Sequence, residues 1–194
     1  IAQRKVNTLV LVHNSEIMKN WVEDFEKFLQ IDEDLPEYIT PKGRRKKRKS
    51  VIGTLSGGRN TLGGILDVAM ITSLGQGDDV NPLIKNYGMV IMDECHHAGA
   101  AIAEDVLNDV SAKYVYGLTA TPKRDDGQEQ KIFMQLGPIR YRYTAKDRAA
   151  AQNVQHFVYP RFTRLFAPNA NKLSYNQARR VVVDSTVRNE LILT

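Results

Sequence analysis

The sequence predicts an α/β protein with a mostly parallel sheet flanked by helices. Thr8–Val12 and Met89–Met92 are short, continuous apolar runs, which is the pattern of strands buried on both faces. Between and after such runs, apolar residues recur at the three- and four-residue spacing of amphipathic helices. Strands that alternate with helices are typical of a parallel sheet covered by helices.

The first elements are a strand over Thr8–Val12 and a helix after it. Asn14 and Ser15 come directly after the strand, and both residue types cap helices. The apolar residues of the following segment recur at helical spacing, so one side of the helix is expected to pack on the core. These residues are Ile17, Met18, Trp21, Val22, Phe25, Phe28 and Leu29.

No periodicity is present over residues 31–50, where acids, prolines and then basic residues predict a surface insertion or loop. Short strands are expected next at Val51–Leu55 and Asp67–Ile71, on either side of a glycine-rich stretch. Met89–Met92 is the following strand, and it ends directly at two carboxylates. Residues 102, 106 and 110 are apolar and step by four, which predicts a helix.

The final part of the chain has a different pattern. Tyr114–Leu118 predicts one more apolar strand. Strands are expected at Ile139–Tyr143 and His156–Phe166, around a short polar helix. Residues 167–171 predict a linker, and a helical stretch is expected from Leu173 to the end.

The composition is that of a folded globular protein, with 42% hydrophobic and 25% charged residues. Its net charge of +5 comes from one segment, because Lys42 and residues 44–49 carry seven positive charges, and removing these seven leaves −2. Such a run can bind phosphates without reading sequence. A solvated, disordered loop is the alternative, and it is slightly favoured.

Cysteine usage and hydropathy predict a cytoplasmic protein that does not bind a membrane. The one cysteine, Cys95, cannot form an internal disulfide. No stretch approaches the ~18 apolar residues that a membrane-spanning helix needs.

Two adjacent carboxylates, Asp93 and Glu94, follow the strand Met89–Met92. A nucleotide-hydrolysing site needs one carboxylate to hold magnesium and a second to orient and deprotonate the attacking water, and a strand end is a rigid mount for both. A zinc site with Cys95, His96 and His97 is the rival interpretation. It is disfavoured because consecutive residues point in different directions and no second pair of ligands lies at the usual spacing.

A second motif, Gly-Leu-Thr-Ala-Thr-Pro over residues 117–122, also lies at a strand end. Together with the preceding Asp-Glu-Cys-His it makes two independent motifs in a consistent order. Residues 86–127, which contain both motifs, resemble superfamily 2 DEAD/DEAH-box helicases of the DExH type, in the branch of type III restriction subunits and related bacterial DNA helicases.

The resemblance implies a role for each motif residue. Asp93 would hold Mg²⁺, Glu94 would be the general base, and His96 would link the ATP site to the nucleic-acid site. Thr119 and Thr121 would couple hydrolysis to movement. ATP and Mg²⁺ are the implied cofactors of the parent protein.

The resemblance extends upstream. Asn14 lies in a segment similar to motif Ia, Gly57 and Gly58 resemble the paired glycines of the family, and Thr72 and Ser73 lie in a segment similar to motif Ib or Ic. In the family these loops face the nucleic-acid backbone, so the resemblance implies that these five residues bind nucleic acid, and DNA is the expected partner.

The sequence departs from the family in one respect, because no G-x-x-x-x-G-K-[ST] phosphate-binding loop occurs in it. The resemblance places that loop upstream of Ile1. Residues 1–166 are therefore expected to form an incomplete first RecA-like domain, and residues 167–194 the linker and first helix of a second one. The strand Tyr114–Leu118 is expected to have an unpaired edge where the strand of the missing loop would lie.

The predicted function is a fragment of an ATP-dependent DNA helicase or translocase. The phosphate-binding loop and the second RecA-like domain are then its partners in the parent, and the isolated chain is expected to bind neither ATP nor Mg²⁺. The alternative is a non-catalytic module that binds nucleic acid or a partner through a degenerate helicase fold. The intact acid pair favours the first interpretation, and a Gly-Lys-Thr or Gly-Lys-Ser upstream of Ile1 would decide between them.

Overall fold

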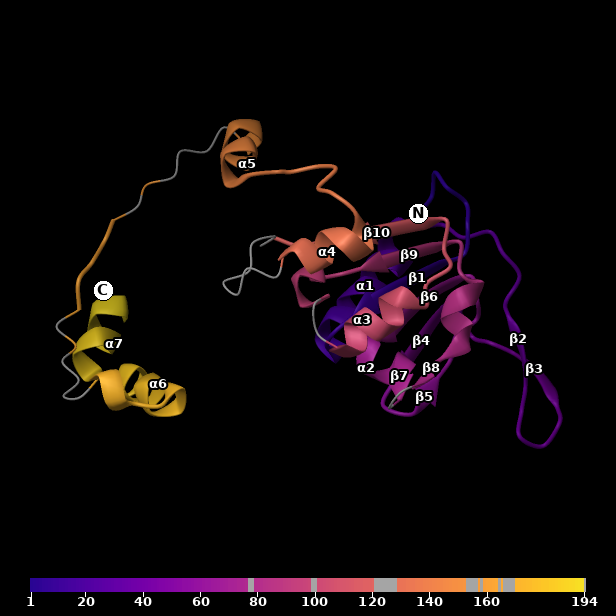
Figure 1. The fold of residues 1–194 in the computed structure, drawn as a ribbon, viewed down its shortest axis with the longest axis horizontal. Coiled ribbons are helices and arrows are strands. Elements are labelled where there is room, and N and C mark those ends of the chain that lie inside the picture. Colours follow the sequence, from indigo (N-terminus) through magenta and orange to yellow (C-terminus); the bar gives the residue numbers. More distant parts are fainter. Residues whose placement is uncertain are drawn as a thin grey trace. The chain divides into compact units, whose positions relative to one another are not determined.

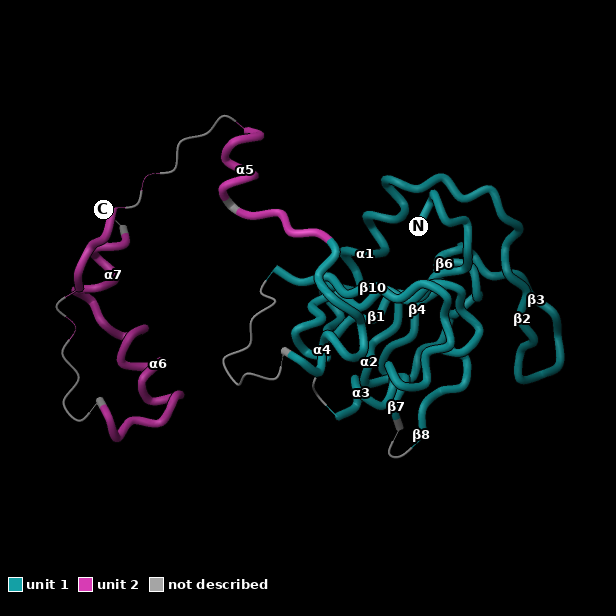
Figure 2. Tube along the Cα trace, turned by 45° about the horizontal axis from the view of Figure 1, so that its top comes forward, with its two compact units in different colours: residues 1–140 teal, residues 141–194 magenta. Residues whose placement is uncertain are grey.

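The chain folds into two compact units, residues 1–140 and residues 141–194 (Figure 2). The computed structural model describes residues 1–76, 79–98, 101–120, 129–152, 157, 159–163, 165 and 170–193. The predicted domain boundary after residue 166 lies within the second unit, and it stays a prediction.

The first unit is built on a six-stranded sheet with the order β10-β9-β1-β6-β4-β5 (Figure 1). Its strands are β1 (Thr8–Val12), β4 (Ile52–Ser56), β5 (Arg59–Asn60), β6 (Leu66–Met70), β9 (Met89–Met92) and β10 (Tyr114–Gly117). All neighbours pair in parallel except β4 and β5, which are antiparallel. The predicted α/β fold with a mostly parallel sheet is confirmed.

Each strand sends alternate side chains to opposite faces of the sheet, so both faces are apolar. Helices cover both of them. Leu9 and Leu11 of β1 are buried in an apolar cluster that also contains residues of three helices. These helices are α2 (Ile71–Leu74), α3 (Ala101–Asn108) and α4 (Glu129–Leu136). Val10 and Val12 are buried on the other face, against α1 (Ser15–Phe28). The core therefore consists of two apolar layers, one on each side of the central strands.

The start of α1 has the predicted cap. The side-chain oxygen of Asn14 accepts the backbone N–H of Ile17 at 2.8 Å, which satisfies one of the free donors of the first turn. The predicted apolar stripe packs on the sheet with one exception, Phe28, whose side chain is 69% exposed. Phe28 is the last residue of the helix.

The segment predicted as a surface insertion or loop, residues 31–50, is not an irregular loop, because it contains an exposed antiparallel hairpin of β2 (Glu37–Ile39) and β3 (Arg45–Lys47). Pro41 follows Thr40, and Gly43 has φ +74°, a left-handed conformation that favours glycine. The N–H of Gly43 donates to the carbonyl of Thr40 at 2.8 Å. The Pro and Gly spacing is the turn signal that the run of charges concealed.

The amino edge of the sheet is held by a buried carboxylate, Asp67 of β6, which is 0% exposed. Its oxygens accept the N–H groups of Gly63 at 2.9 Å and Gly64 at 2.7 Å and the hydroxyl of Tyr87 at 2.7 Å. Gly53 of β4 lies against the same carboxylate, since a Cβ there would be 2.0 Å from its Oδ1. The loop before β6 is thereby fixed by one side chain.

Short elements complete the first unit. They are the paired strands β7 (Gly75–Gln76) and β8 (Asp79–Val80) and the 3-10 turns η1 (Pro82–Asn86) and η2 (Cys95–His97). At the opposite side of the sheet, β10 pairs with β9 alone among the described residues. Tyr116 and Leu118 beside this edge are 38% and 44% exposed. The predicted unpaired edge is confirmed for the described part of the chain.

The second unit is helical. It contains α5 (Ala145–Gln152), η3 (Ala170–Lys172), α6 (Tyr175–Val183) and α7 (Thr186–Leu193). The short polar helix is confirmed as α5. The strand predicted at Ile139–Tyr143 is wrong, and the described residues of His156–Phe166 are not in strands either. Aromatic and β-branched residues form a strand only beside a neighbour that accepts their backbone hydrogen bonds, and the described residues offer none here.

The helical stretch predicted from Leu173 is two helices. Ser174 begins α6 with a capping box. Its hydroxyl accepts the backbone N–H of Gln177, and the side-chain oxygen of Gln177 accepts the backbone N–H of Ser174. Ser185 accepts the N–H of Arg188 at 3.3 Å and so begins α7. A second serine cap therefore divides the stretch. Of the predicted linker, residues 167–169 lie outside the described residues.

No helix in the described residues is long and apolar enough to cross a membrane.

Candidate functional site

The carboxyl edge of the sheet collects the predicted site residues. Parallel strands end at the same edge, so each residue that follows a strand lies there. Asn14 follows β1, Gly57 and Gly58 follow β4, Thr72 and Ser73 lie in α2 directly after β6, Asp93 and Glu94 follow β9, and Thr119 follows β10. Thr121 lies outside the described residues.

Asp93 is oriented by two hydrogen bonds. The indole N–H of Trp21 in α1 donates to its Oδ2 at 2.7 Å, and the backbone N–H of Glu94 donates to its Oδ1 at 2.8 Å. Its own N–H donates to the carbonyl of Leu11 at 3.0 Å, which ties the residue to β1. Each carboxylate oxygen keeps a lone pair for a further ligand.

Trp21 is a site residue that the sequence pattern did not reveal. Its place in the apolar stripe of α1 predicts a core residue, and it does pack against the sheet. Trp side chains combine an apolar body with one donor, and buried indoles usually find an acceptor for it. The signal that could have found Trp21 is a tryptophan on the core-facing side of the helix after β1, because β9, which ends at Asp93, is a neighbour of β1 in the sheet.

Glu94 has a left-handed backbone, with φ 48° and ψ 50°. This conformation is rare for residues other than glycine and is concentrated at functional sites. The carbonyl of Glu94 accepts the N–H of His97 at 3.0 Å, which starts the turn η2. The tight reversal after β9 places the Glu94 side chain beside the end of β10.

Glu94, His96 and Thr119 form a polar cluster. Nδ1 of His96 lies 3.2 Å from Oε2 of Glu94 and 3.0 Å from the hydroxyl of Thr119. The same hydroxyl lies 3.5 Å from Oε2 of Glu94, at the outer limit of a hydrogen bond. The structure thus brings Thr119, which follows β10, to two residues of the turn after β9.

Cys95 packs inward below this cluster. Its N–H donates to the carbonyl of Leu118 at 2.9 Å, and burial raises the pKa of its thiol. A Cβ at Gly117 would lie 2.8 Å from its Sγ, so glycine is needed for the close approach of β10. Among the described residues no three His, Cys, Asp or Glu side chains converge as metal ligands, which disfavours the zinc interpretation further.

Histidine rings connect the end of β1 to this turn. The His13 ring centroid lies 4.8 Å from that of His97, which in turn lies 4.1 Å from that of His96. Nε2 of His13 lies 3.2 Å from Nδ2 of Asn14. His13 was not among the predicted site residues, although it directly precedes Asn14. The ring contacts give the Asn14 segment a physical link to the acid pair.

The donor set of Asp93 suits magnesium. Mg²⁺ binds proteins through one or two carboxylates and completes its shell with water and substrate phosphates. A half-exposed carboxylate held by two donors and open to solvent meets that requirement. We therefore find Asp93 compatible with the ligand role that the resemblance implies.

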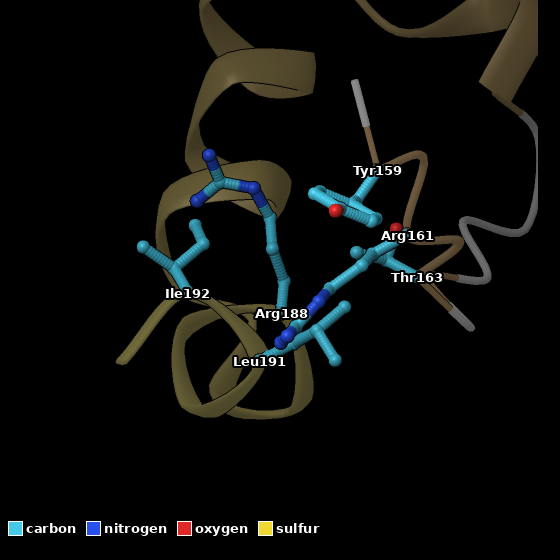
Figure 3. A pocket seen from close by; sticks show the side chains of 6 residues that line it. All are labelled: Tyr159, Arg161, Thr163, Arg188, Leu191 and Ile192. Carbon is cyan, nitrogen blue, oxygen red and sulfur yellow. The ribbon is translucent and has the colours of Figure 1, made fainter. Parts of the chain in front are cut away.

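Two hollows of the structure contain none of the predicted site residues. One of about 410 Å³ is in the second unit, where Arg161 and Arg188 lie near Tyr159 (Figure 3). The other, of about 350 Å³, is at the amino edge of the sheet and is lined by Arg48 and Tyr87 among others.

Comparison with known families places the whole of this edge in one of them. Residues 1–124 match the family described as "Type III restriction enzyme, res subunit". The chain belongs to this family. The resemblance to superfamily 2 DExH helicases and their type III restriction branch is thereby confirmed, and the matched residues include the acid pair and Thr119 of this res-subunit domain.

Several relatives match this res-subunit chain over most of its length. The DNA 3'-5' translocase XPB2 of Sulfurisphaera tokodaii is 24% identical over 180 residues, which are 93% of this chain and 36% of that protein. The DNA 3'-5' helicase XPB of Kineococcus radiotolerans is 29% identical over 187 residues, 92% of this chain and 30% of that protein. The chain thus spans about a third of the length of these relatives.

Proposed function

We propose that this chain is part of an ATP-dependent DNA helicase or translocase and carries the acid pair that hydrolyses ATP. The observation that carries the proposal is the cluster of Glu94, His96 and Thr119 at the ends of two neighbouring strands, beside Asp93. The relatives named as a DNA 3'-5' translocase and a DNA 3'-5' helicase favour DNA as the substrate.

Asp93 and Glu94 divide the chemistry between them. Asp93 would hold the magnesium ion, which when bound would supply positive charge against the phosphates of ATP. Glu94 orients a water molecule toward the γ-phosphorus and takes its proton as the new P–O bond forms and the bond to the β-phosphate oxygen breaks. The hydrogen bonds from Trp21 and from the Glu94 amide fix the Asp93 carboxylate, so the two acids stay in register.

His96 and Thr119 connect the acid pair to the next strand. Both lie within 3.5 Å of the carboxylate that would take the proton. A change in the charge of Glu94 therefore alters contacts to the end of β10, where the second threonine of the motif, Thr121, also follows. We propose this cluster as the point where hydrolysis is coupled to movement.

The nucleic-acid contacts belong to the same edge. Asn14, Gly57, Gly58, Thr72 and Ser73 all follow strands that end there, and Gly57 and Gly58 are exposed at the turn between β4 and β5. Amides and hydroxyls at such turns bind phosphate oxygens without reading bases. We propose that they contact the DNA backbone.

The chain by itself is proposed to bind ATP too weakly for turnover. Affinity for the β- and γ-phosphates comes from a cradle of loop amides with a lysine, and no G-x-x-x-x-G-K-[ST] occurs in these 194 residues. The parent protein supplies that loop and a second RecA-like domain in this proposal. Micromolar ATP affinity of the isolated chain, measured by calorimetry with Mg²⁺ present, would contradict it.

The test of the acid pair uses the parent protein. Glu94→Gln keeps the size of the side chain but removes the base, so ATP turnover is expected to fall by about 10²-fold or more while ATP binding is retained. Asp93→Asn is expected to weaken binding of Mg·ATP itself. Wild-type turnover in Glu94→Gln would overturn the assignment, and a parent without any ATPase activity would favour the non-catalytic module instead.

A further inference from the structure

We propose that the β2–β3 hairpin is a second DNA-binding element, which holds duplex DNA at the amino edge of the sheet, away from the Asp93 edge. The hairpin lies between the end of α1 and the start of β4, and it extends outward from the sheet (Figure 1). This inference takes only its partner, DNA, from the proposed function. Binding by the hairpin needs neither a nucleotide nor the acid pair.

The hairpin is attached firmly at its base. The N–H of Arg48 donates to the carbonyl of Pro36 at 2.7 Å, which closes the two arms. The Arg48 guanidinium lies over the Tyr38 ring, 4.2 Å from its centroid, and Nη2 lies 3.4 Å from the carbonyl of Leu62. These contacts fix the hairpin to the loop before β6. It is therefore a preorganised element, and less conformational entropy is lost when it binds.

Most of the positive charge of the hairpin has no ion-pair partner among the described residues. Six basic side chains from Lys42 to Lys49 are exposed, namely those of Lys42, Arg44, Arg45, Lys46, Lys47 and Lys49. None of them forms an ion pair with another described residue. The one acid in either strand is Glu37, which lies opposite Lys47 in the register. Arg48, the seventh base, is the anchor described above.

The arrangement of these charges favours a duplex over a single strand. Side chains alternate across a ribbon, so Arg45 and Lys47 leave one face of β3 and Lys46 leaves the other. A two-stranded ribbon fits the major groove of DNA, where phosphate rows run along both sides. A single strand or an acidic peptide offers one row of charge and would engage one face only.

The proposal is tested with the 194-residue chain and a 20-base-pair duplex. Replacing Lys42, Arg45 and Lys46 by Gln removes three charges and spares both Lys47, which faces Glu37, and the Arg48 anchor. The matched control replaces Lys19, Lys85 and Lys131 by Gln, which removes the same charge from lysines that are ion-paired to carboxylates. Circular dichroism checks that both variants fold like the wild type.

Binding is measured by fluorescence anisotropy over a salt series. Each phosphate contact adds about 0.9 to the slope of log K against log salt, so the hairpin variant is expected to lose about 2.7 from the slope while the control keeps the wild-type value. Equal loss in both variants would show a general charge effect and overturn the proposal, as would a wild-type chain that does not bind the duplex.

Two further probes separate the partner classes. A single strand of the same sequence is expected to bind with a smaller contribution from the hairpin, and polyglutamate of the same charge is expected to bind at least tenfold more weakly than the duplex. Polyglutamate binding as tight as the duplex would overturn the nucleic-acid assignment in favour of an acidic protein. Glu94→Gln in the parent reports on hydrolysis alone, so the two proposals fail separately.

Discussion

The two compact units differ in the interactions that stabilise each of them. In residues 1–140, parallel strands bury apolar side chains on both faces, and all fully buried hydrophobic residues of the described chain belong to this unit. In residues 141–194, large side chains such as Tyr159 and Phe162 are 79% and 91% exposed. The helices of the second unit depend instead on local caps, as at Ser174 and Ser185. Long-range burial thus stabilises one unit, and short-range hydrogen bonds the other.

Two aspartates show the same contrast. Asp67 is fully buried and accepts three hydrogen bonds, one from Tyr87, which is 20 residues away in the chain. Asp147 is exposed and accepts the N–H and the hydroxyl of Thr144, three residues before it. These bonds, the hydroxyl first, lower the pKa of Asp147, but they connect only the first turn of α5.

The largest expected effect is that of Asp67→Ala. It leaves the buried Tyr87 hydroxyl and the part-buried N–H of Gly63 without an acceptor, while the N–H of the exposed Gly64 can donate to water. Each of these two unpaired donors costs about 1–3 kcal/mol, so the free energy of unfolding is expected to fall by about 2–6 kcal/mol. Urea unfolding followed by the fluorescence of Trp21 measures it, because this is the one tryptophan and lies in the first unit.

Asp147→Ala is the matched control and is expected to leave the Trp21 transition unchanged. A shift of that transition comparable to the one from Asp67→Ala would mean that the units unfold together and would break the comparison.

Leucine truncation tests burial directly. Leu9 of β1 is 0% exposed and Leu191 of α7 is partly exposed. Leu9→Ala is expected to cost about 3 kcal/mol by opening a cavity between the sheet and its helices. Leu191→Ala is expected to change stability by less than about 1 kcal/mol. Thermal unfolding followed by circular dichroism, beside the Trp21 signal, gives both values, and similar costs at the two positions would contradict the contrast.

The smallest expected effect is on alkaline stability. Burial, and then the neighbouring Asp67, raise the pKa of the Tyr87 hydroxyl well above its ordinary value of 10.0. A group with a raised pKa stabilises the fold fully below its unfolded-state pKa and loses that contribution as the pH rises beyond it. At pH 11 the loss is expected to be about 1.4 kcal/mol, and Tyr87→Phe should reduce it. Equal pH dependence of both proteins between pH 9 and pH 11 would refute this.

The strands β1, β4, β6, β9 and β10 of the first unit could be predicted within about one residue, because each is a short run rich in apolar residues. The hairpin of residues 37–47 could not be predicted from periodicity, since its exposed strands carry charges on both faces. The strands expected near Tyr141 and Tyr159 failed for the opposite reason: residues that suit a strand formed none without a neighbour.

The candidate site was predictable to a similar degree. Asp93 and Glu94 were expected at the end of a strand, the family resemblance implied His96 and Thr119 as their partners, and the structure brings Glu94, His96 and Thr119 together. Trp21 was missed, since the rotation of a helix that brings one indole N–H to a carboxylate is set by packing and not by spacing along the chain. The roles of these residues in hydrolysis stay predictions.

The left-handed backbone of Glu94 has a consequence for engineering. Holding a residue with a Cβ at φ 48° costs conformational energy that glycine avoids. Selection for thermal stability alone is therefore expected to favour Glu94→Gly, although this substitution removes the proposed base. If Glu94 is the base, the turn after β9 is a point of stability–activity trade-off, and a library screened only for heat resistance is expected to lose this carboxylate.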